Sequence, residues 1–196
     1  MIKSKNNEFG KDLYILYPGD HYATQEDCVI GTISASCMVI CLYDPIRHIG
    51  GMGHFVIPGA MGTEGIYRDE IGSHGITSME YLMGEIVKLG GDRKKLRAKI
   101  FGVANVSGVN SWTDGIKNSI FTFIDEYFRV EHIPIEKEDI GGDRRRKLYF
   151  FPRTGKVLRK LLENNQDSSE FIKMEQEYIN RVFKEKNTYG KVIVFE

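Results

Sequence analysis

The chain has 196 residues and carries 27 basic and 27 acidic side chains, so its formal net charge is zero. A chain of this length folds as one domain with room for an appendage. It lacks the positive field that attracts nucleic acid or an anionic membrane surface, which argues against both kinds of partner.

The sequence also shows neither a targeting segment nor the cysteine pattern of a disulfide-bonded protein. Residues 1–8 lack the uninterrupted apolar segment of a signal peptide, and no later stretch has the roughly twenty apolar residues of a membrane span. The 3 cysteines, an odd number, argue against a disulfide framework. We therefore expect a cytoplasmic protein with no membrane insertion.

Three apolar segments near the N-terminus predict strands, at residues 29–33, 38–43 and 54–57. The middle segment is apolar on both faces, which indicates a strand buried on both sides. A short polar turn joins it to the third segment, so the two should pair as an antiparallel hairpin. Cys37, at the start of the first hairpin strand, and His54, on the second, should then meet.

Helical periodicity appears in two central segments. Apolar residues recur at helical spacing from Thr77 to Leu89, with Thr77 and Glu80 placed as a capping box and Gly90-Gly91 as a stop signal. A second set of apolar residues at helical spacing predicts another helix over residues 116–127.

Extended segments follow and surround the second helix. We expect a short strand within 96–106 and strands at 130–135 and 147–151. A turn at 153–156 should lead into another extended segment at 157–160. Strands and helices alternate irregularly, which predicts the α+β class.

The C-terminal residues differ from the rest of the chain. A polar break at residues 164–169 precedes an amphipathic helix, and residues 191–195 predict a final strand. The apolar stripe of this helix comprises Phe171, Met174, Tyr178 and Val182. We therefore divide the chain into a main domain, residues 1–163, and a helix-strand extension, residues 164–196, that packs on it.

Cys37 and His54 together suggest nucleophilic chemistry. A free thiol has a pKa of about 8.5 and needs a neighbouring base to become a thiolate at neutral pH, and an imidazole is such a base. Cys41 lies four residues after Cys37, which predicts the same strand face and a role in packing. A zinc site made of Cys37, Cys41 and His54 has no common ligand spacing, so we expect no metal.

The segment Ser36–Pro45, followed by Gly50–Pro58, resembles the signature of the CheD family, in which the cysteine and the histidine are also 17 positions apart. Weaker likeness extends the resemblance over roughly residues 10–162. It comprises Lys99–Asn105, Gly115–Asn118 and Gly141–Val157.

This resemblance implies an enzyme that deamidates selected glutamines of methyl-accepting chemotaxis receptors to glutamate, with Cys37 as nucleophile and His54 as base. It implies a three-layer α-β-β fold, with a β-sandwich-like core and flanking helices, similar to the catalytic domain of cytotoxic necrotizing factor toxins. The expected partners are the receptors and a CheC-type phosphatase, and no cofactor is implied.

Two departures from the family pattern bear on catalysis. The family has a catalytic threonine six positions before the cysteine, where this chain has Gly31, so Thr32 or Ser34 would have to replace it. Ala35 stands where the family has glycine, which predicts strain if that position needs a positive φ. An alternative function is therefore a catalytically weak binding module that regulates a CheC-type phosphatase or a receptor. A related thiol hydrolase would share the same two residues.

A basic run, Arg144–Lys147, allows two interpretations. It predicts either a solvated loop that leads into a strand or a docking surface for an acidic receptor helix bundle.

Overall fold

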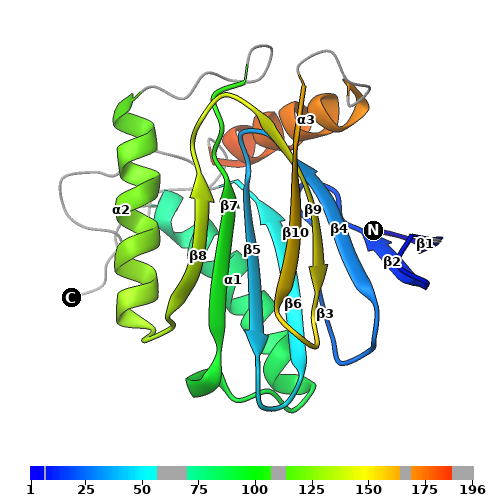
Figure 1. Cartoon of the computed structure of the whole chain (residues 1–196). Coiled ribbons are helices and arrows are strands. Elements are labelled where there is room, and N and C mark those ends of the chain that lie inside the picture. The colour runs from blue at the N-terminus through cyan, green and yellow to red at the C-terminus, as the bar shows by residue number, and fades with distance from the viewer. Residues whose placement is uncertain (7, 57–69, 107–113, 164–168, 187–196) are drawn as a thin grey trace.

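The computed structural model of this chain describes residues 1–6, 8–56, 70–106, 114–163 and 169–186. Within these ranges the chain forms two five-stranded sheets and three α-helices (Figure 1). The first sheet has the order β1 (Ile2–Asn6), β2 (Lys11–Ile15), β4 (Val29–Ser34), β9 (Arg145–Phe151) and β10 (Lys156–Leu162). The second has the order β3 (His21–Thr24), β6 (Ile49–Phe55), β5 (Met38–Asp44), β7 (Arg97–Gly102) and β8 (Ile135–Ile140). The predicted α+β class is confirmed.

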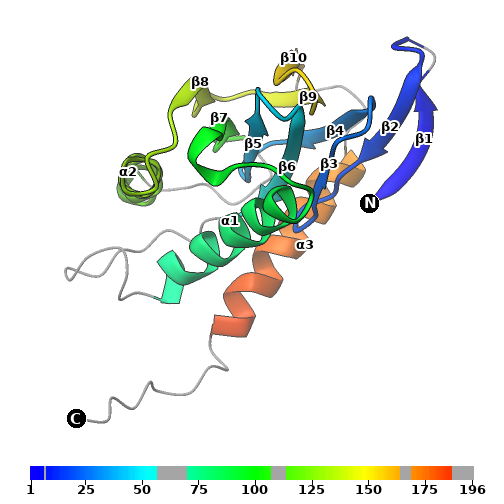
Figure 2. The ribbon, with the colours of Figure 1, turned by 90° about the horizontal axis from the view of Figure 1, so that it is seen from below.

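The helices are α1 (Glu70–Lys88), α2 (Asp114–Val130) and α3 (Ser169–Lys186), and a single 3₁₀ turn, η1 (Arg93–Lys95), precedes β7. Figure 2 shows β9 and β10 on one side of β5 and β6, with α1 on the other side. Among the described residues, no helix combines the length and the apolar character needed to cross a membrane.

Two clusters of buried apolar residues lie between the layers, one between the two sheets and one between the second sheet and the helices. The inter-sheet cluster comprises Leu16, Ile30, Val39, Cys41, Tyr43, Met52, Phe101, Leu148 and Phe150. The larger helix-facing cluster joins the second sheet to the helices, and it includes Ile40, Leu42, Leu82, Ile86, Ile124 and Ile179. Alternate residues of β5 enter opposite clusters and all seven are buried, as the continuous apolar run predicted.

The predicted hairpin of β5 and β6 is confirmed, with Met38 opposite Phe55 and Val39 opposite His54. The predicted start of its second strand was wrong, because β6 begins at Ile49 and runs through three glycines. Glycine is depleted in strands, so these three residues obscured the strand pattern in the sequence. The close packing of α1 on β6 nevertheless requires them. A Cβ atom at Gly51 would lie 2.7 Å from the Leu82 side chain of α1.

The predicted start of α1 was also wrong. The helix begins at Glu70, so Thr77 lies inside it and is not a cap. Glu80 accepts hydrogen bonds from Arg93 and Tyr127 instead of closing a capping box. The predicted stop is confirmed, since Gly90 has a φ of +98° just after the last helical turn.

The segment 130–135 was wrongly predicted as a strand. Helix α2 continues to Val130, and His132 then adopts a left-handed backbone with a φ of 54°. Strand β8 starts only at Ile135, where it pairs in parallel with β7. The predicted final strand at 191–195 lies outside the described residues.

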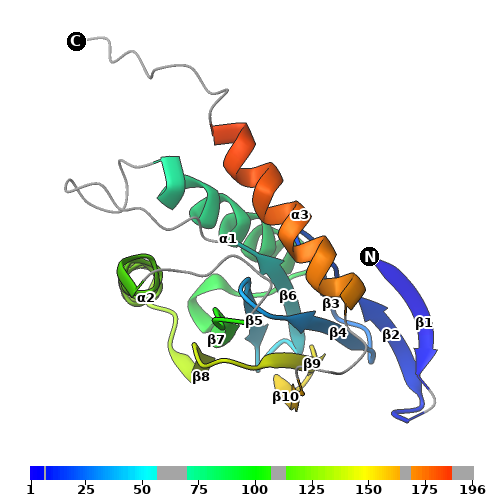
Figure 3. The ribbon, with the colours of Figure 1, turned by 90° about the horizontal axis from the view of Figure 1, so that it is seen from above.

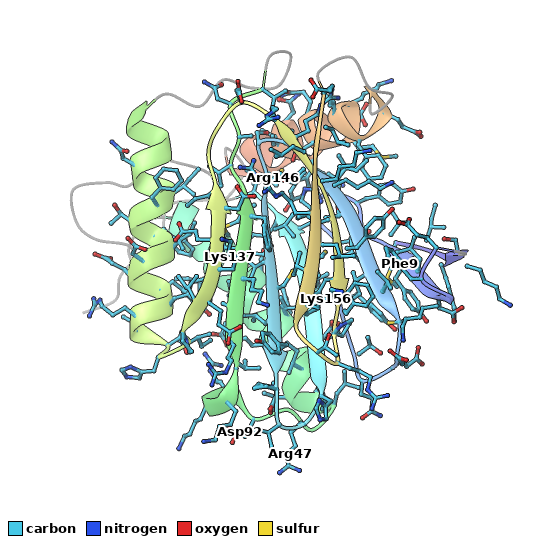
Figure 4. All side chains as sticks on the ribbon, viewed as in Figure 1. Phe9, Arg47, Asp92, Lys137, Arg146 and Lys156 are labelled. Atoms are coloured by element: carbon cyan, nitrogen blue, oxygen red, sulfur yellow. The ribbon has the colours of Figure 1, made fainter. Side chains whose placement is uncertain are left out.

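The basic run is not a solvated loop. Arg145 and Arg146 are 2% and 4% exposed and belong to β9. Figure 4 labels Arg146 near the upper ends of the strands, where its guanidinium donates to the carboxylate of Asp139 at 2.9 Å and to the Gly141 carbonyl at 2.8 Å. Arg146 therefore links β9 to β8, while Arg145 donates to the Glu163 carbonyl just after β10. Their burial leaves little of this run free to dock an acidic partner.

Candidate active site

The corner between β4 and β5 positions Cys37, which is fully buried just before the first residue of β5. The Cys37 carbonyl accepts hydrogen bonds from the Ser34 hydroxyl at 2.7 Å and from the Val103 N–H at 3.1 Å. The neighbouring Gly102 has a φ of +106°, and a Cβ atom there would lie 2.1 Å from the Cys37 carbonyl oxygen. The exit of β7 can approach this corner so closely only because it has no side chain.

His54, near the end of β6, is held from both sides. Its backbone N–H donates to Asp20 at 2.9 Å, and its carbonyl accepts from Gly19 at 2.7 Å. Its Nδ1 lies 2.9 Å from the hydroxyl of Thr32, which comes from the opposite sheet. The imidazole is completely buried.

The hydrogen bonds of Thr32 determine which ring nitrogen of His54 is available for proton exchange with a reacting group. Its hydroxyl has one proton, which it donates to the Leu16 carbonyl at 2.9 Å. The hydroxyl oxygen must then accept from His54, which puts a proton on Nδ1. The other nitrogen, Nε2, is therefore the one that can exchange protons with a reacting group.

Glu175, in the middle of α3, is the third ionisable group of the site. Its Oε1 accepts from the N–H of Ala35 at 3.1 Å and of Cys37 at 2.8 Å, and its Oε2 accepts from the N–H of Ser36 at 3.1 Å. Consecutive backbone donors that converge on one point form an anion-binding concavity. We call the three N–H groups of residues 35–37 the backbone cradle.

The thiol, the imidazole and this carboxylate form one cluster. The Cys37 Sγ, one ring nitrogen of His54 and one carboxylate oxygen of Glu175 all lie within 4.8 Å of one another. The His54 Nε2 is 3.4 Å from Glu175 Oε1. Two acceptors cannot face each other favourably at this distance, so one proton lies between the imidazole and the carboxylate.

The protonation preferences follow from these contacts. Burial raises the pKa of the Cys37 thiol well above its ordinary value, and the negative charge and hydrogen bond of Glu175 raise it further. Burial alone would also raise the pKa of Glu175, but the hydrogen bond and charge of His54 and the bonds from the backbone cradle hold it below its ordinary value. The arrangement seen here therefore keeps a carboxylate in place and disfavours the thiolate.

The residues proposed as a third catalytic member occupy different places. Thr32 reaches His54, although it is five residues before Cys37 rather than six. Gly31 faces the other way, where a Cβ atom would contact the side chains of Leu13, Tyr149 and Ile15. Ser34 supports the Cys37 carbonyl. The strain expected at Ala35 is not found, because its φ is not positive.

The predicted placement of Cys41 on the same face as Cys37 was wrong. Cys37 precedes the regular part of β5 and packs in the helix-facing cluster, whereas Cys41 belongs to the inter-sheet cluster. Strand alternation therefore does not apply between them. Cys28, Cys37 and Cys41 are all free thiols.

Glu175 was missed by the sequence analysis, although a signal was present. It lies on the same helix face as Phe171, Tyr178 and Val182, where an acidic residue interrupts the apolar stripe. Burying a charged side chain costs free energy unless hydrogen bonds or an opposite charge compensate it. An acidic residue on a buried helix face therefore indicates a specific polar partner. Thiolate, imidazole and carboxylate are also zinc ligands, but Cys41 takes no part in this cluster.

A buried thiol, an imidazole with one oriented nitrogen and a row of backbone donors are the groups found in cysteine-dependent acyl-transfer enzymes. The family model of CheD, described as CheD chemotactic sensory transduction, matches residues 57–161 of the chain. The chain is 36% identical to a protein of Janthinobacterium sp. (strain Marseille), over 89% of the chain and 85% of that protein. It is 38% identical to one of Methylobacillus flagellatus, over 92% and 88%. Both are named probable chemoreceptor glutamine deamidase CheD, and this chain belongs to the CheD family.

Solved structures give weaker similarity. A hypothetical protein of Bacillus licheniformis, YfiH, aligns with a TM-score of 0.37 at 14% identity, over 62% of this chain and 49% of that chain. A protein of Neisseria meningitidis aligns with a TM-score of 0.43 at 8% identity, over 74% and 77%.

Proposed function

We propose that this chain hydrolyses the side-chain amide of glutamines in chemotaxis receptors, giving glutamate and ammonia. One observation carries the proposal: Cys37, His54 and the backbone cradle surround a single point, which Glu175 occupies. The names of the relatives support the same reaction and the same substrate class. The enzyme is then a protein-glutamine amidohydrolase of the cysteine type.

The first half of the reaction forms a thioester. His54 Nε2 takes the thiol proton of Cys37, the sulfur attacks the carboxamide carbon of the substrate, and the C–N bond breaks. The leaving nitrogen takes a proton from His54 Nε2 and departs as ammonia. In the second half, Nε2 removes a proton from water, whose oxygen attacks the thioester carbon. The C–S bond then breaks, Nε2 returns the proton to the sulfur, and glutamate and the Cys37 thiol are released.

The backbone cradle supplies electrostatic stabilisation in both halves. The carboxamide oxygen gains negative charge when the carbon becomes tetrahedral. The N–H groups of residues 35–37 already hold the two carboxylate oxygens of Glu175 in this structure, at 2.8–3.1 Å, with those of Ala35 and Cys37 on the same oxygen. Each such donor contributes about 2.7–4 kcal/mol to lowering the barrier.

Thr32 acts through His54 in this scheme. By accepting from Nδ1–H it holds the tautomer and the ring orientation that leave Nε2 free toward the substrate. We therefore assign Thr32 as a positioning residue rather than as a group that touches the substrate.

Several finer expectations remain parts of this proposal. They are the likeness of the layered fold to the catalytic domain of cytotoxic necrotizing factor toxins, a cytoplasmic location and contact with a CheC-type phosphatase. The division into residues 1–163 and 164–196 is another. It is supported by the packing of α3, whose Ile179 and Val182 are buried in the helix-facing cluster.

The decisive experiment measures deamidation directly. The full chain is incubated with a receptor cytoplasmic fragment, and peptides are analysed by mass spectrometry for a gain of about 1 Da at glutamine, which replacing NH₂ by OH produces. We expect this gain with the wild-type chain and none with Cys37→Ala. A chain that contacts the receptor or a CheC-type phosphatase but leaves every glutamine unchanged would instead be the weak binding module.

A further inference from the structure

Helix α3 covers the candidate active site. Seen from above, it crosses the ends of β4 and β6 and lies beside α1 (Figure 3). Its inner face carries Tyr178, Ile179 and Val182, which are all buried in the helix-facing cluster. At its N-terminal end the ring of Phe171 stacks on Tyr17, with centroids 5.4 Å apart. The groove beneath α3 is therefore shaped to receive an amphipathic helix.

One charged side chain points from this helix into the reaction centre. Glu175 is 2% exposed, and its carboxylate is held by the backbone cradle and by His54 Nε2. Oε1 accepts from the N–H groups of Ala35 and Cys37 and lies 3.4 Å from His54 Nε2, whereas Oε2 accepts from the Ser36 N–H. The same groups act in the proposed reaction, where the cradle holds the carbonyl oxygen and Nε2 protonates the leaving nitrogen. The carboxyl group of Glu175 thus lies where the reacting carboxamide must lie.

The chemical identity of this side chain matches the end of the reaction. Deamidation converts glutamine into glutamate, and glutamate is the residue found here. A carboxylate does not react with a thiolate, so it can remain in the site without being consumed. An amide of the same size and shape would be a substrate.

We propose that α3 is a built-in product mimic, which occupies the groove for a glutamine-bearing helix and places Glu175 where the product glutamate lies. This inference rests on the proposed function and adds to it a substrate geometry and a form of autoinhibition. The substrate glutamine is presented from a helix, with its side chain directed at Cys37 and with apolar neighbours on the same face. Such a helix must displace α3 before it can react.

The closed arrangement has the properties of an inhibited state. Cys37 and His54 are both inaccessible to solvent, with exposures of 0%. A cleft of about 350 Å³ lies outside this enclosure, along α1 and α3, and is lined by residues of both helices, among them Tyr81 and Arg181. An approaching helix can therefore begin to contact this side of α3 without first unfolding the sheets.

The sharpest test replaces the product by the substrate in cis. In Glu175→Gln the side chain keeps its size, and its carbonyl oxygen can take the place of Oε1 between the N–H groups of Ala35 and Cys37. The NH₂ group then replaces Oε2 and loses the hydrogen bond from the Ser36 N–H, so the helix should dock in the same place but more weakly. The Cys37 thiol then attacks the new amide, ammonia leaves, and water regenerates the thiol and a carboxylate. We expect the purified variant to gain about 1 Da at position 175, as peptide mass spectrometry would show.

Two control variants test whether deamidation at position 175 requires both its placement in the site and the Cys37 thiol. Glu177→Gln carries the same change on the exposed face of α3 and should keep its amide. Glu175→Gln combined with Cys37→Ala should also keep it. If Glu175→Gln is stable while the wild-type chain deamidates a receptor fragment, the proposed function stands and the product mimic is overturned. If neither reaction occurs, the proposed function fails and this inference fails with it.

A second variant separates inhibition from catalysis. Glu175→Ala should deamidate a receptor fragment faster, and iodoacetamide should alkylate its Cys37 faster, each by about tenfold or more. This range follows because a minor open state typically makes up about 0.1–10% of molecules. A fall in deamidation with an unchanged melting temperature would show that Glu175 assists the reaction, and would overturn the proposal.

Discussion

The β5–β6 hairpin and helix α3 meet at the same site but are held there by different forces. The hairpin is fixed by continuous pairing of β5 with β6 and β7. Among the described residues, helix α3 is held by side-chain contacts, which come from an apolar face and from one carboxylate that is 138 residues from Cys37 in the sequence and contacts it. Breaking a sheet disrupts the whole core, whereas releasing α3 breaks only local contacts. We call the β5–β6 hairpin the floor of the candidate site and α3 its cover. The backbone pairing makes the floor the more rigid of the two, and the proposed autoinhibition requires that the cover be displaced.

The largest expected effect concerns the floor. Cys37→Ala removes the nucleophile and should lower receptor deamidation by on the order of 10³-fold or more. Cys41→Ala should keep the activity, because its thiol lies in the inter-sheet cluster, and should cost about 1 kcal/mol of unfolding free energy. Initial rates and urea unfolding of both variants measure this. Equal activity losses in the two variants would contradict the assignment of Cys37.

A smaller effect is expected from the support of His54. Thr32→Val keeps the side-chain shape but leaves the buried Nδ1–H without its acceptor, which costs about 1–3 kcal/mol. If this free energy is lost in the transition state, the activation free energy rises by the same amount and the deamidation rate falls by about 5- to 150-fold. Thr32→Ser retains the hydroxyl and should recover most of the rate. A pH–rate profile that is the same in Thr32→Val as in the wild type would argue against a positioning role.

The contact of α3 with the floor should depend on pH. The folded state holds the pKa of Glu175 below its ordinary value of 4.5. Its carboxylate therefore contributes stability above about pH 4.5, and this contribution is lost as the pH falls through the lowered value. The groups facing it are His54 and Cys37.

Unfolding measurements can test this dependence if the amide variant is protected from self-reaction. We compare Cys37→Ala with Cys37→Ala/Glu175→Gln by denaturant unfolding at several pH values. The difference in unfolding free energy should be largest near neutral pH and should shrink below about pH 4.5. A difference that grows on acidification would contradict the ionised state of Glu175.

The smallest expected effect concerns metal removal. Nδ1 of His54 and both oxygens of Glu175 already have hydrogen-bond partners, and the proposed reaction needs only a thiol, an imidazole and backbone donors. Deamidation should therefore be unchanged after treatment with a chelator, measured on a receptor fragment with the wild-type chain. Loss of activity that added zinc restores would replace the thiol mechanism by a metal site.

Local patterns were read correctly where neighbouring residues decide the structure. The hairpin, the buried character of β5, the stop at Gly90 and the turn before β10 all follow from short-range sequence signals. The start of β6 and the capping box at Thr77 were misread, because close helix–sheet packing at Gly51 and the contacts of Glu80 outweigh local preferences.

By itself, the sequence determined the α+β class and the pairing of Cys37 with His54, since a short antiparallel hairpin must bring its ends together. Only the tertiary structure decided that Thr32, and not Gly31, faces His54, because that contact joins two sheets whose register no local pattern specifies. It also placed Glu175 against the backbone cradle. An acidic residue on an apolar helix face shows that a partner exists, but which partner depends on where the helix docks.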